Sequence, residues 1–487
     1  MSTILRQTKI VVTLGPALDD LEVLKQVILA GADVFRANFS HADHSAHEKR
    51  IQQIRDIAAA QKKTVAILAD LQGPKIRIGR FKENKIHLQE GQAFTLDIEL
   101  EEAYGDEKSV SVNYKHLLHD VHTGDTLLLD DGRIVLSVKK CDGSRIHCQV
   151  IVGGELSNNK GINRLGGGLS AAALTEKDRT DLKEAVRLQA DYIAISFPRT
   201  AQDIQEARKL LQAAGGSAGI IAKIERAEAI TNIEEIIQAA DAVMIARGDL
   251  GVEIGDAELP AAQKRIIQLA ATFNKPVITA TQMLETMINN TIPTRAEVSD
   301  VANAVLDGTD AVMLSAETAI GKYPDKAVAA MDRICLSAEK HRSSQPQPTR
   351  EISFKHVDEA IAMTAMYTAN HLDIRAIIAL TESGTTPLLM SRIKSTIPIY
   401  ALSRHKSTLR RMTLYRGVYP IPFDATHIDR RIINQAAILE LQQRGILKNS
   451  DLIILTKGDL IGVHGRTNSL KIVTVGDLPL YTTEKKI

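Results

Sequence analysis

The chain has 487 residues, of which 44% are hydrophobic and 24% charged, a composition typical of a globular protein with two to four domains. A formal net charge of +1 and 3% aromatic residues without tryptophan argue against nucleic acid as a partner. We expect no membrane partner, because no apolar run reaches about 18 residues. We expect no cleavable leader, and the cysteines lack metal spacing, which predicts a cytoplasmic protein with free thiols at Cys141, Cys148 and Cys335.

The first 70 residues alternate strand and helix patterns. Short apolar runs predict strands at 8–14, 33–39 and 64–70, and amphipathic segments predict helices at 19–30 and 44–60. Such alternation is typical of a parallel sheet covered by helices, either a closed barrel or a doubly wound sheet.

The pattern changes between Leu71 and Gly167. Alternating apolar residues flank two Asp-Gly pairs, Asp131-Gly132 and Asp142-Gly143, which are the strongest short-range signal for a β-hairpin. This stretch is too long for a loop, so we predict an inserted β domain that acts as a lid. The three glycines at 166–168 are interpreted as a hinge between this insert and the barrel.

The strand and helix alternation returns after the insert. Helical patterns fall at 175–189, 201–213, 227–240, 260–273, from 282, at 296–306 and at 326–341. Predicted strands fall at 191–196, 220–225, 241–246, 276–281 and 310–315. Three strands before the insert and five after it make eight, and about 250 residues outside the insert match a TIM (β/α)8 barrel. A doubly wound sheet is the alternative.

A third region follows a polar, proline-containing linker at 341–350. Helices are predicted at 357–370 and 429–444, and strands at 375–381, 398–403, 417–423, 451–458 and 471–476. This pattern predicts a C-terminal α/β domain. The expected boundaries are 1–70 and 168–345 for the barrel, 71–167 for the insert and 346–487 for the C-terminal domain.

Polar side chains stand at the carboxyl ends of successive predicted barrel strands, where folds of this class build their active sites. In chain order they are Arg36, Asn38, Ser40, Asp70, Ser196, Lys223, Glu225, Arg247, Asp249, Thr279, Thr281, Ser315 and Glu317. Serine and threonine at such ends are as often helix caps. A charge in a buried strand is costly, so Lys223, Glu225 and Asp249 are the strongest functional candidates, with a surface ion-pair cluster as the alternative.

The chemistry of these side chains suits a phosphorylated anion. Mg²⁺ is typically held by one or two protein carboxylates and by substrate oxygens, a role open to Glu225 and Asp249. Arg36 and Lys223 would neutralise a phosphoryl group, and the turn at Gly248 offers backbone N–H groups to a carboxylate. A phosphorylated enol acid would satisfy the whole set.

The chain resembles the pyruvate kinase family over essentially its full length. The resemblance is carried by TKIVVTLGP, FRANFSHA, DLQGPKIR, LSNNKGIN, AKIERAEA, ARGDLGVEI, ITATQMLETM, PTRAEVSDVANAVLDGTDAVMLSAET and LYRGVYP. It implies a TIM barrel with an inserted β-barrel domain and a C-terminal α/β domain. It also implies Mg²⁺- or Mn²⁺-dependent phosphoryl transfer from phosphoenolpyruvate to ADP, giving pyruvate and ATP in the final step of glycolysis.

The same resemblance implies roles for single residues at the reaction centre. Glu225 and Asp249 would bind Mg²⁺, and the catalytic Lys223 and Arg36 would contact the transferring phosphoryl group. Catalytic Thr281 would lie near the methylene carbon that is protonated. The substrate carboxylate would be bound by the amides of Ala246, Arg247, Gly248 and Asp249.

Further roles concern the nucleotide and a monovalent cation. The resemblance implies nucleotide-phosphate contacts from His41, Arg77 and Lys160, and a monovalent-cation site at Asn38, Ser40 and Asp70. Many family members have glutamate where this chain has Lys75 in GPKIR. An ammonium at this position is already a cation, so we predict that K⁺ is not required. The alternative is that Lys75 points to solvent.

The C-terminal domain contains a candidate effector site in TESGTTPLL. Backbone amides at a helix start form a nest for phosphate, and the family binds activating sugar phosphates at the matching loop. The expected effector contacts are Thr381, Ser383, Gly384, Thr385, Thr386, Arg404, His464 and Arg466. The sequence looks most like the bacterial type activated by AMP or sugar monophosphates. A stretch containing Arg295 and Glu297 contacts the neighbouring subunit in family tetramers, which implies a homotetramer.

Two other functions remain open at this point. A metal-dependent TIM-barrel lyase acting on a pyruvate enolate would share the carboxylates but would need no nucleotide lid, so the insert with Lys160 argues against it. A non-catalytic metabolite sensor could keep the fold, but it would not need Lys223 and Thr281. These residues leave ADP and GDP open as phosphoryl acceptors.

Overall fold

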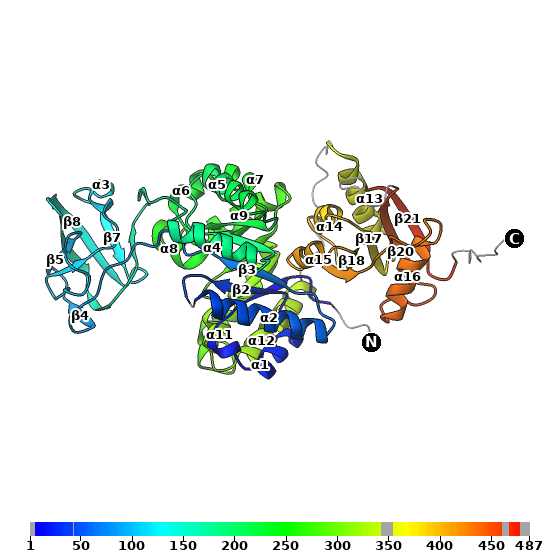
Figure 1. The fold of residues 1–487 in the computed structure, drawn as a ribbon, viewed down its shortest axis with the longest axis horizontal. Helices are drawn as coiled ribbons and strands as arrows, with labels where there is room; N and C mark the ends of the chain where they lie inside the picture. Colours follow the sequence, from blue (N-terminus) through cyan, green and yellow to red (C-terminus); the bar gives the residue numbers. More distant parts are fainter. Residues whose placement is uncertain (1–4, 42, 342–353, 460–466, 478–487) are drawn as a thin grey trace. The chain divides into compact units, whose positions relative to one another are not determined.

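The computed structural model describes residues 5–41, 43–341, 354–459 and 467–477 (Figure 1). By its contacts the chain forms two compact units. The first unit comprises Met1–Ala37, Ser45–Leu68 and Met283–Ile487, and the second comprises Asn38–His44 and Ala69–Gln282. The domain boundaries expected from the sequence stay a prediction, and most of the expected linker lies outside the described residues.

Eight parallel strands close into a barrel in the order β1-β16-β15-β14-β13-β12-β3-β2. The strands are β1 (Lys9–Thr13), β2 (Val34–Asn38), β3 (Ala66–Asp70), β12 (Tyr192–Ile195), β13 (Gly219–Ile224), β14 (Ala242–Ala246), β15 (Val277–Ala280) and β16 (Ala311–Leu314). Outside β2, every residue of these strands is buried. Parallel strands covered by helices require such two-sided burial, which explains their continuous apolar runs. The predicted barrel is confirmed, against the doubly wound sheet.

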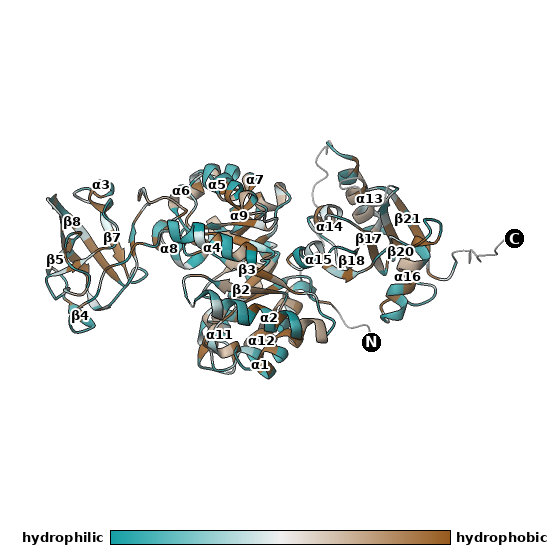
Figure 2. Cartoon of the chain, viewed as in Figure 1, coloured by the Kyte–Doolittle hydropathy of each residue, from teal (hydrophilic) through white to brown (hydrophobic). Residues whose placement is uncertain are grey.

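Helices alternate with these strands. They are η1 (Pro16–Leu18), α1 (Leu21–Leu29), α2 (His44–Ala60), α4 (Glu176–Arg187), α5 (Ala201–Ala213), α6 (Ala227–Thr231), α7 (Ile233–Ala239), α8 (Arg247–Ile254), α9 (Leu259–Thr272), η2 (Glu285–Ile288), α10 (Arg295–Asp307), α11 (Ala316–Ala319) and α12 (Pro324–Lys340). Figure 2 shows hydrophobic colours along the strands and many hydrophilic residues on the helices, whose buried residues are mostly apolar. This distribution places the hydrophobic faces of the helices against the strands.

Two predicted helices differ from the structure. The single helix expected at 227–240 is two helices, because Asn232 interrupts it and donates its side-chain amide to the Arg199 carbonyl at 2.9 Å. The helix expected from Gln282 is wrong. Thr281 and Gln282 have φ values of +66° and +56°, and consecutive left-handed residues do not fit a right-handed helix. Only the short 3-10 helix η2 follows them before α10.

The insert folds as a β domain, as predicted. Its elements are β4 (Lys85–Leu88), β5 (Ala93–Asp97), β6 (Ser109–Ser111), α3 (Leu117–Asp120), β7 (Thr126–Leu129), β8 (Ile134–Asp142), β9 (Arg145–Val152), β10 (Gly154–Ser157) and β11 (Ile162–Arg164). One sheet has the order β11-β7-β8-β9-β5-β6, and β10 pairs with β4 in another. Both predicted Asp-Gly hairpins are confirmed: β7 pairs antiparallel with β8, and β8 with β9.

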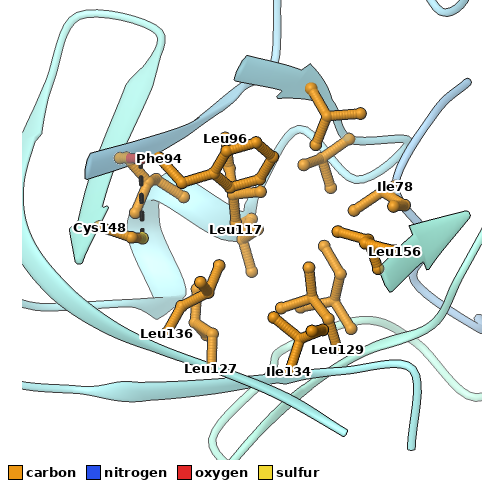
Figure 3. Packing of buried hydrophobic residues seen from close by; sticks show 14 of the residues in the cluster. Ile78, Phe94, Leu96, Leu117, Leu127, Leu129, Ile134, Leu136, Cys148 and Leu156 are labelled. Atoms are coloured by element: carbon orange, nitrogen blue, oxygen red, sulfur yellow. Dashed lines mark hydrogen bonds between the residues drawn. The ribbon is translucent and has the colours of Figure 1, made fainter. Parts of the chain in front are cut away.

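One hydrophobic core holds the insert together. Figure 3 shows side chains from several strands and α3 pointing toward one another, among them Phe94, Leu117, Leu136 and Leu156. Each of these four side chains is no more than 1% exposed. Because Leu156 of β10 belongs to the same cluster as Leu136 of β8, the two sheets share this core.

The C-terminal region is a three-layer α/β structure. Its elements are α13 (Val357–His371), β17 (Ala376–Leu380), α14 (Thr385–Ser391), β18 (Ile399–Ser403), α15 (Lys406–Met412), β19 (Val418–Pro422), α16 (Ile433–Gln443), β20 (Leu452–Gly458) and β21 (Thr467–Thr474). The sheet order is β19-β18-β17-β20-β21. Ile377 and Ala379 pack with α13, α14 and α15, whereas Ala376 and Ile378 pack with α16. This alternation follows from the two-residue period of a strand.

Two properties of the chain bear on its environment. None of the helices in the described ranges has both the length and the apolar character needed to cross a bilayer. Cys141, Cys148 and Cys335 are all free thiols.

Candidate active site

Strand β13 ends in two buried opposite charges, Lys223 and Glu225. Lys223 Nζ lies 3.0 Å from Glu225 Oε1 and 3.2 Å from Asp70 Oδ1. The same ammonium donates to Ser196 Oγ at 2.6 Å. Lys223 is 8% exposed and Glu225 is 2% exposed, so the interaction takes place away from bulk water. The ends of β3, β12 and β13 thus enclose one ammonium with two carboxylates and a hydroxyl.

The surroundings of Glu225 disfavour the ionised form of its carboxylate. Burial raises the pKa of Glu225, and the negative charges of Asp249 and Asp70 raise it further, while Lys223 lowers it. The backbone N–H of Phe197 donates to Glu225 Oε2 at 2.9 Å, from a residue with φ +58°. An additional cation beside Glu225 would therefore stabilise the ionised carboxylate.

Asp249 lies in the first turn of α8, directly after β14. Its Oδ1 accepts a hydrogen bond from Lys75 Nζ at 2.8 Å. Its charge interacts with that of Glu225, although the two carboxylates come from different strand ends. The structure therefore brings Lys223, Glu225 and Asp249 into one electrostatic group. Their catalytic and metal-binding roles stay predictions.

Thr281 is held over the start of α8. The backbone N–H of Gly248 donates to Thr281 Oγ1 at 2.9 Å, and Thr281 Oγ1 donates to the Ala280 carbonyl at 2.7 Å. Thr281 has φ +66°, which is a genuine outlier for a β-branched residue. Such strain persists only where the surroundings enforce it and is frequent at functional sites.

The Arg247 side chain links α8 to the end of β15 through hydrogen bonds. Its guanidinium donates to the carbonyls of Ala280 at 3.2 Å and Thr281 at 2.7 Å, and the residue is 6% exposed. The Arg247 side chain therefore has a structural task. Its predicted role in substrate binding, together with that of Ala246, rests on backbone amides alone.

Two carboxylates of this group are the candidate ligands of a divalent metal. Within the described ranges, no cluster of three or more His, Cys, Asp or Glu side chains is arranged to hold a metal. Glu225 and Asp249 supply two carboxylates whose charges interact. Mg²⁺ commonly takes one or two protein carboxylates and completes its octahedral shell with water and substrate phosphate. The pair therefore fits a Mg²⁺ ion that shares its ligands with the substrate.

Three cations of the insert region, Lys75, Arg77 and Lys160, lie on two segments joined by a β-bridge. Arg77 pairs with Gly161 in a β-bridge and donates to the Asn159 carbonyl at 2.8 Å, while Lys160 Nζ lies 2.7 Å from Asp130 Oδ1. A Cβ atom added to Gly161 would lie 3.4 Å from Lys75 Cε. The side chain of Lys75 thus passes beside Gly161 and ends at Asp249.

Several predicted site residues come from β2 and the loop that follows it. Arg36 belongs to the first compact unit, where its guanidinium donates to Thr13 Oγ1 at 3.1 Å. In the second unit, Asn38 Oδ1 accepts the N–H of Ser40 at 3.1 Å, and His41 is exposed. The proposed roles of these residues stay predictions.

The candidate effector loop begins α14. The N–H of Gly384, which has φ +85°, donates to Thr381 Oγ1 at 2.9 Å, and the hydroxyls of Ser383 and Thr385 lie 2.8 Å apart. Thr386 and Thr467 hydroxyls lie 2.7 Å apart. Arg404 Nε donates to the Glu382 carboxylate at 3.3 Å. His464 and Arg466 lie outside the described residues.

Two contributors were given no role from the sequence. Ser196, which the sequence marked only as one of the polar strand ends, accepts a hydrogen bond from Lys223 Nζ. Phe197 supplies an amide to Glu225, but nothing in the sequence signals the left-handed backbone of a phenylalanine.

Comparisons with known proteins agree along the whole chain. Residues 5–328 match the family model described as pyruvate kinase, barrel domain, and residues 359–473 match pyruvate kinase, alpha/beta domain. The chain is 54% identical to pyruvate kinase II of Salmonella typhimurium, over 98% of this chain and 100% of that protein. It is 53% identical to a pyruvate kinase of Haemophilus influenzae, over 94% of this chain and 97% of that protein.

Proposed function

This chain belongs to the pyruvate kinase family and catalyses phosphoryl transfer from phosphoenolpyruvate to ADP, and we propose that its reaction centre is the buried group Lys223, Glu225 and Asp249. The observation that carries the proposal is the enclosure of Lys223 Nζ, 3.0 Å from Glu225 and 3.2 Å from Asp70. A buried ammonium fixed by three partners is preorganised for an anion and needs no rearrangement when charge develops.

Lys223 acts on the transferring group as a fixed positive charge. Phosphoryl transfer passes through a loose transition state, so catalysis depends on position and on neutralising the phosphoryl oxygens. Lys223 would do both, and its ammonium would also stabilise the enolate oxygen left behind. Arg36 would contribute a second cation to the phosphoryl group.

Glu225 and Asp249 are proposed to hold Mg²⁺, for which Mn²⁺ is a substitute. When bound there, the ion would supply Lewis-acid neutralisation of phosphate oxygens. The raised pKa of Glu225 supports this assignment, because the carboxylate lacks sufficient positive charge in the protein alone.

Thr281 and the start of α8 are proposed to hold the rest of the substrate. The backbone N–H groups from Ala246 to Asp249, at the start of α8, would bind the carboxylate of phosphoenolpyruvate. The Gly248 amide now donates to Thr281 Oγ1, so substrate would replace this hydrogen bond and free the hydroxyl. Thr281 would then assist protonation of the enolate at its methylene carbon.

The insert is proposed to carry the nucleotide phosphates on Arg77 and Lys160, with His41 as a further contact. Closure would exchange their present partners, the Asn159 carbonyl and Asp130, for phosphate oxygens. Lys75 is proposed to replace the monovalent cation that Asn38, Ser40 and Asp70 would otherwise ligate. Its contact with Asp249 supports this role, because it already carries a positive charge to the metal carboxylate.

Regulation, assembly and location complete the proposal. A phosphorylated effector, AMP or a sugar monophosphate, would bind at the start of α14, where Arg404 would exchange Glu382 for phosphate. A homotetramer is supported by the exposed Ile292 and Arg295 at the start of α10. We infer a cytoplasmic location, because all three cysteines are free thiols.

The test is a coupled assay of pyruvate and ATP formation by the full chain. Activity should require phosphoenolpyruvate, ADP and Mg²⁺ together. Pyruvate formation that does not depend on ADP would favour the lyase, and the absence of turnover with intact folding would favour the sensor.

A further inference from the structure

Glu253 is a buried carboxylate that the reaction above does not use. It lies on α8 one turn beyond Asp249, and the i, i+4 spacing places the two residues on the same helix face. Only 4% of Glu253 is exposed. A buried carboxylate costs free energy unless its oxygens are hydrogen-bonded, so its partners show what it stabilises.

The two oxygens of Glu253 bind different parts of the chain. Glu253 Oε2 accepts the backbone N–H of Ala227 at 2.9 Å, two residues after Glu225. Glu253 Oε1 accepts a hydrogen bond from Asn163 Nδ2 at 3.3 Å, and Asn163 lies on β11, the last strand of the insert. One carboxylate thus joins the helix of Asp249, the loop after β13 and the outgoing strand of the insert.

Neighbouring contacts converge on the same junction. The backbone N–H of Gly166 donates to the Glu253 carbonyl at 2.9 Å, and Arg226 donates to the Leu169 carbonyl at 3.0 Å. On the incoming side of the insert, the buried Asp178 accepts the N–H of Gly73 at 3.0 Å. Each of the two segments that connect the insert to the barrel is therefore held by one buried carboxylate.

We propose that Glu253 is a positioning residue for phosphoryl transfer, which holds the outgoing strand of the insert against α8 and so sets where Lys160 meets the Asp249 side of the reaction centre. Lys160 lies three residues before Asn163, and its carbonyl accepts the N–H of Ile78 at 2.9 Å. This inference rests on the roles proposed above for Asp249 and Lys160.

The protonation state of Glu253 provides a second line of support. Burial raises the pKa of Glu253 to about 7, with Glu228 raising it and Arg226 and its two hydrogen bonds lowering it. Both partners of its oxygens are N–H donors, which bind the ionised carboxylate more strongly than the protonated acid. Protonation near neutral pH would loosen the junction.

The decisive variant is Glu253→Gln in the full-length enzyme. The amide keeps the shape of the side chain but offers one acceptor oxygen for two donors. With phosphoenolpyruvate saturating at pH 8, the KM for ADP should rise about tenfold, the effect of losing one hydrogen bond to a charged group. The KM for phosphoenolpyruvate should change by less than about twofold, since the donors at Lys223 and Thr281 are untouched.

The pH profile separates positioning from a merely structural role. In the unmodified enzyme the KM for ADP should rise as pH falls through about 7, and Glu253→Gln should remove this dependence. The matched control is Asp241→Asn. Asp241 also accepts a backbone N–H, that of Ile220 at 2.7 Å, but at the opposite end of β13 from Lys223. This control should leave both KM values and the pH profile unchanged.

Asn163→Ala tests the same contact from the insert and serves if Glu253→Gln does not fold. It should raise the KM for ADP in the same direction. An unchanged KM for ADP in the folded variants, or an equal rise for both substrates, would overturn the positioning role. An unmodified chain that makes no pyruvate from phosphoenolpyruvate and ADP would instead overturn the proposed function.

Discussion

Lys75 Nζ lies 2.8 Å from Asp249 Oδ1, so a permanent ammonium already neutralises a carboxylate proposed to bind Mg²⁺. The two side chains are 26% and 20% exposed, which makes the pair partly screened by solvent. The contact still places a monovalent positive charge beside Asp249, within the group of charges proposed as the reaction centre.

We therefore expect turnover without K⁺. In tetramethylammonium buffer free of K⁺ and Na⁺, the enzyme should retain most of its activity, and added K⁺ should raise it by less than about twofold. Lys75→Glu should reverse this behaviour, because a third carboxylate beside Asp249 needs a cation. Loss of nearly all turnover by the unmodified enzyme in this buffer would refute the role of Lys75.

Replacing Lys223 should abolish the chemical step. Lys223→Met keeps a side chain of similar length but removes the charge on the phosphoryl group and on the enolate, so kcat should fall by at least about 10³-fold, or about 4 kcal/mol of barrier. Lys275→Met is the matched control, since it removes a lysine that donates to the Ala240 carbonyl at the amino end of the barrel strands. A loss below about tenfold at Lys223, with thermal unfolding unchanged, would contradict the assignment.

Removing Asp249 should act mainly on metal binding. In Asp249→Ala the Mg²⁺ concentration for half-maximal activity should rise by at least about tenfold, because one of two carboxylate ligands is lost. Asp256→Ala removes an exposed carboxylate just after α8 and should leave this value unchanged. An unaltered Mg²⁺ requirement in Asp249→Ala would exclude it as a ligand.

Glu253 should also make the free energy of unfolding depend on pH. Its folded pKa of about 7 lies above the ordinary value of 4.5, so the folded state binds the proton more tightly than the unfolded state. The contribution of Glu253 to the free energy of unfolding is therefore highest below pH 4.5. It falls as the pH rises from about 4.5 to 7, and it is constant above about 7. Glu253→Gln should gain stability relative to the unmodified protein over this interval, by at most about 3 kcal/mol. Thermal unfolding at pH 5 and pH 8 measures the difference; no difference would show that Glu253 is ionised without penalty, and a difference of the opposite sign would show that the folded protein favours its ionised form.

The effector proposal is tested at subsaturating phosphoenolpyruvate. AMP, ribose 5-phosphate, glucose 6-phosphate and fructose 1,6-bisphosphate should be titrated separately, and at least one should increase the rate. Arg404→Gln should weaken that response without changing the rate in the absence of effector, because Arg404 lies in the C-terminal region. A uniform lack of response would remove the effector site from the proposal.

Much of the barrel was predictable because buried parallel strands leave a simple signature. The apolar runs that end at Lys223 and Ala246 correspond to β13 and β14, and the Asp-Gly pairs marked two hairpins of the insert. Charges at the ends of such runs also identified the candidate site, because a charge there must have a partner or a function.

Other features depend on backbone conformations that sequence patterns do not reveal. The amide of Phe197 reaches Glu225 from a left-handed residue, and the left-handed pair at Thr281 and Gln282 ends the expected helix. The link between Lys75 and Asp249 joins residues 174 positions apart, and that between Asn163 and Glu253 joins residues 90 apart. Such contacts follow from the closed fold and have no local signal.

The pairing of β1 with β16 sets a condition on biosynthesis. Lys9 lies opposite Ala311, so the first barrel strand must wait for its permanent neighbour until about 300 further residues have left the ribosome, roughly 15 to 60 s at ordinary translation rates. Until then β1 lacks one of its two neighbouring strands in the barrel. Slower elongation lengthens this interval, so we expect the yield of folded enzyme to fall when translation is slowed or chaperones are scarce.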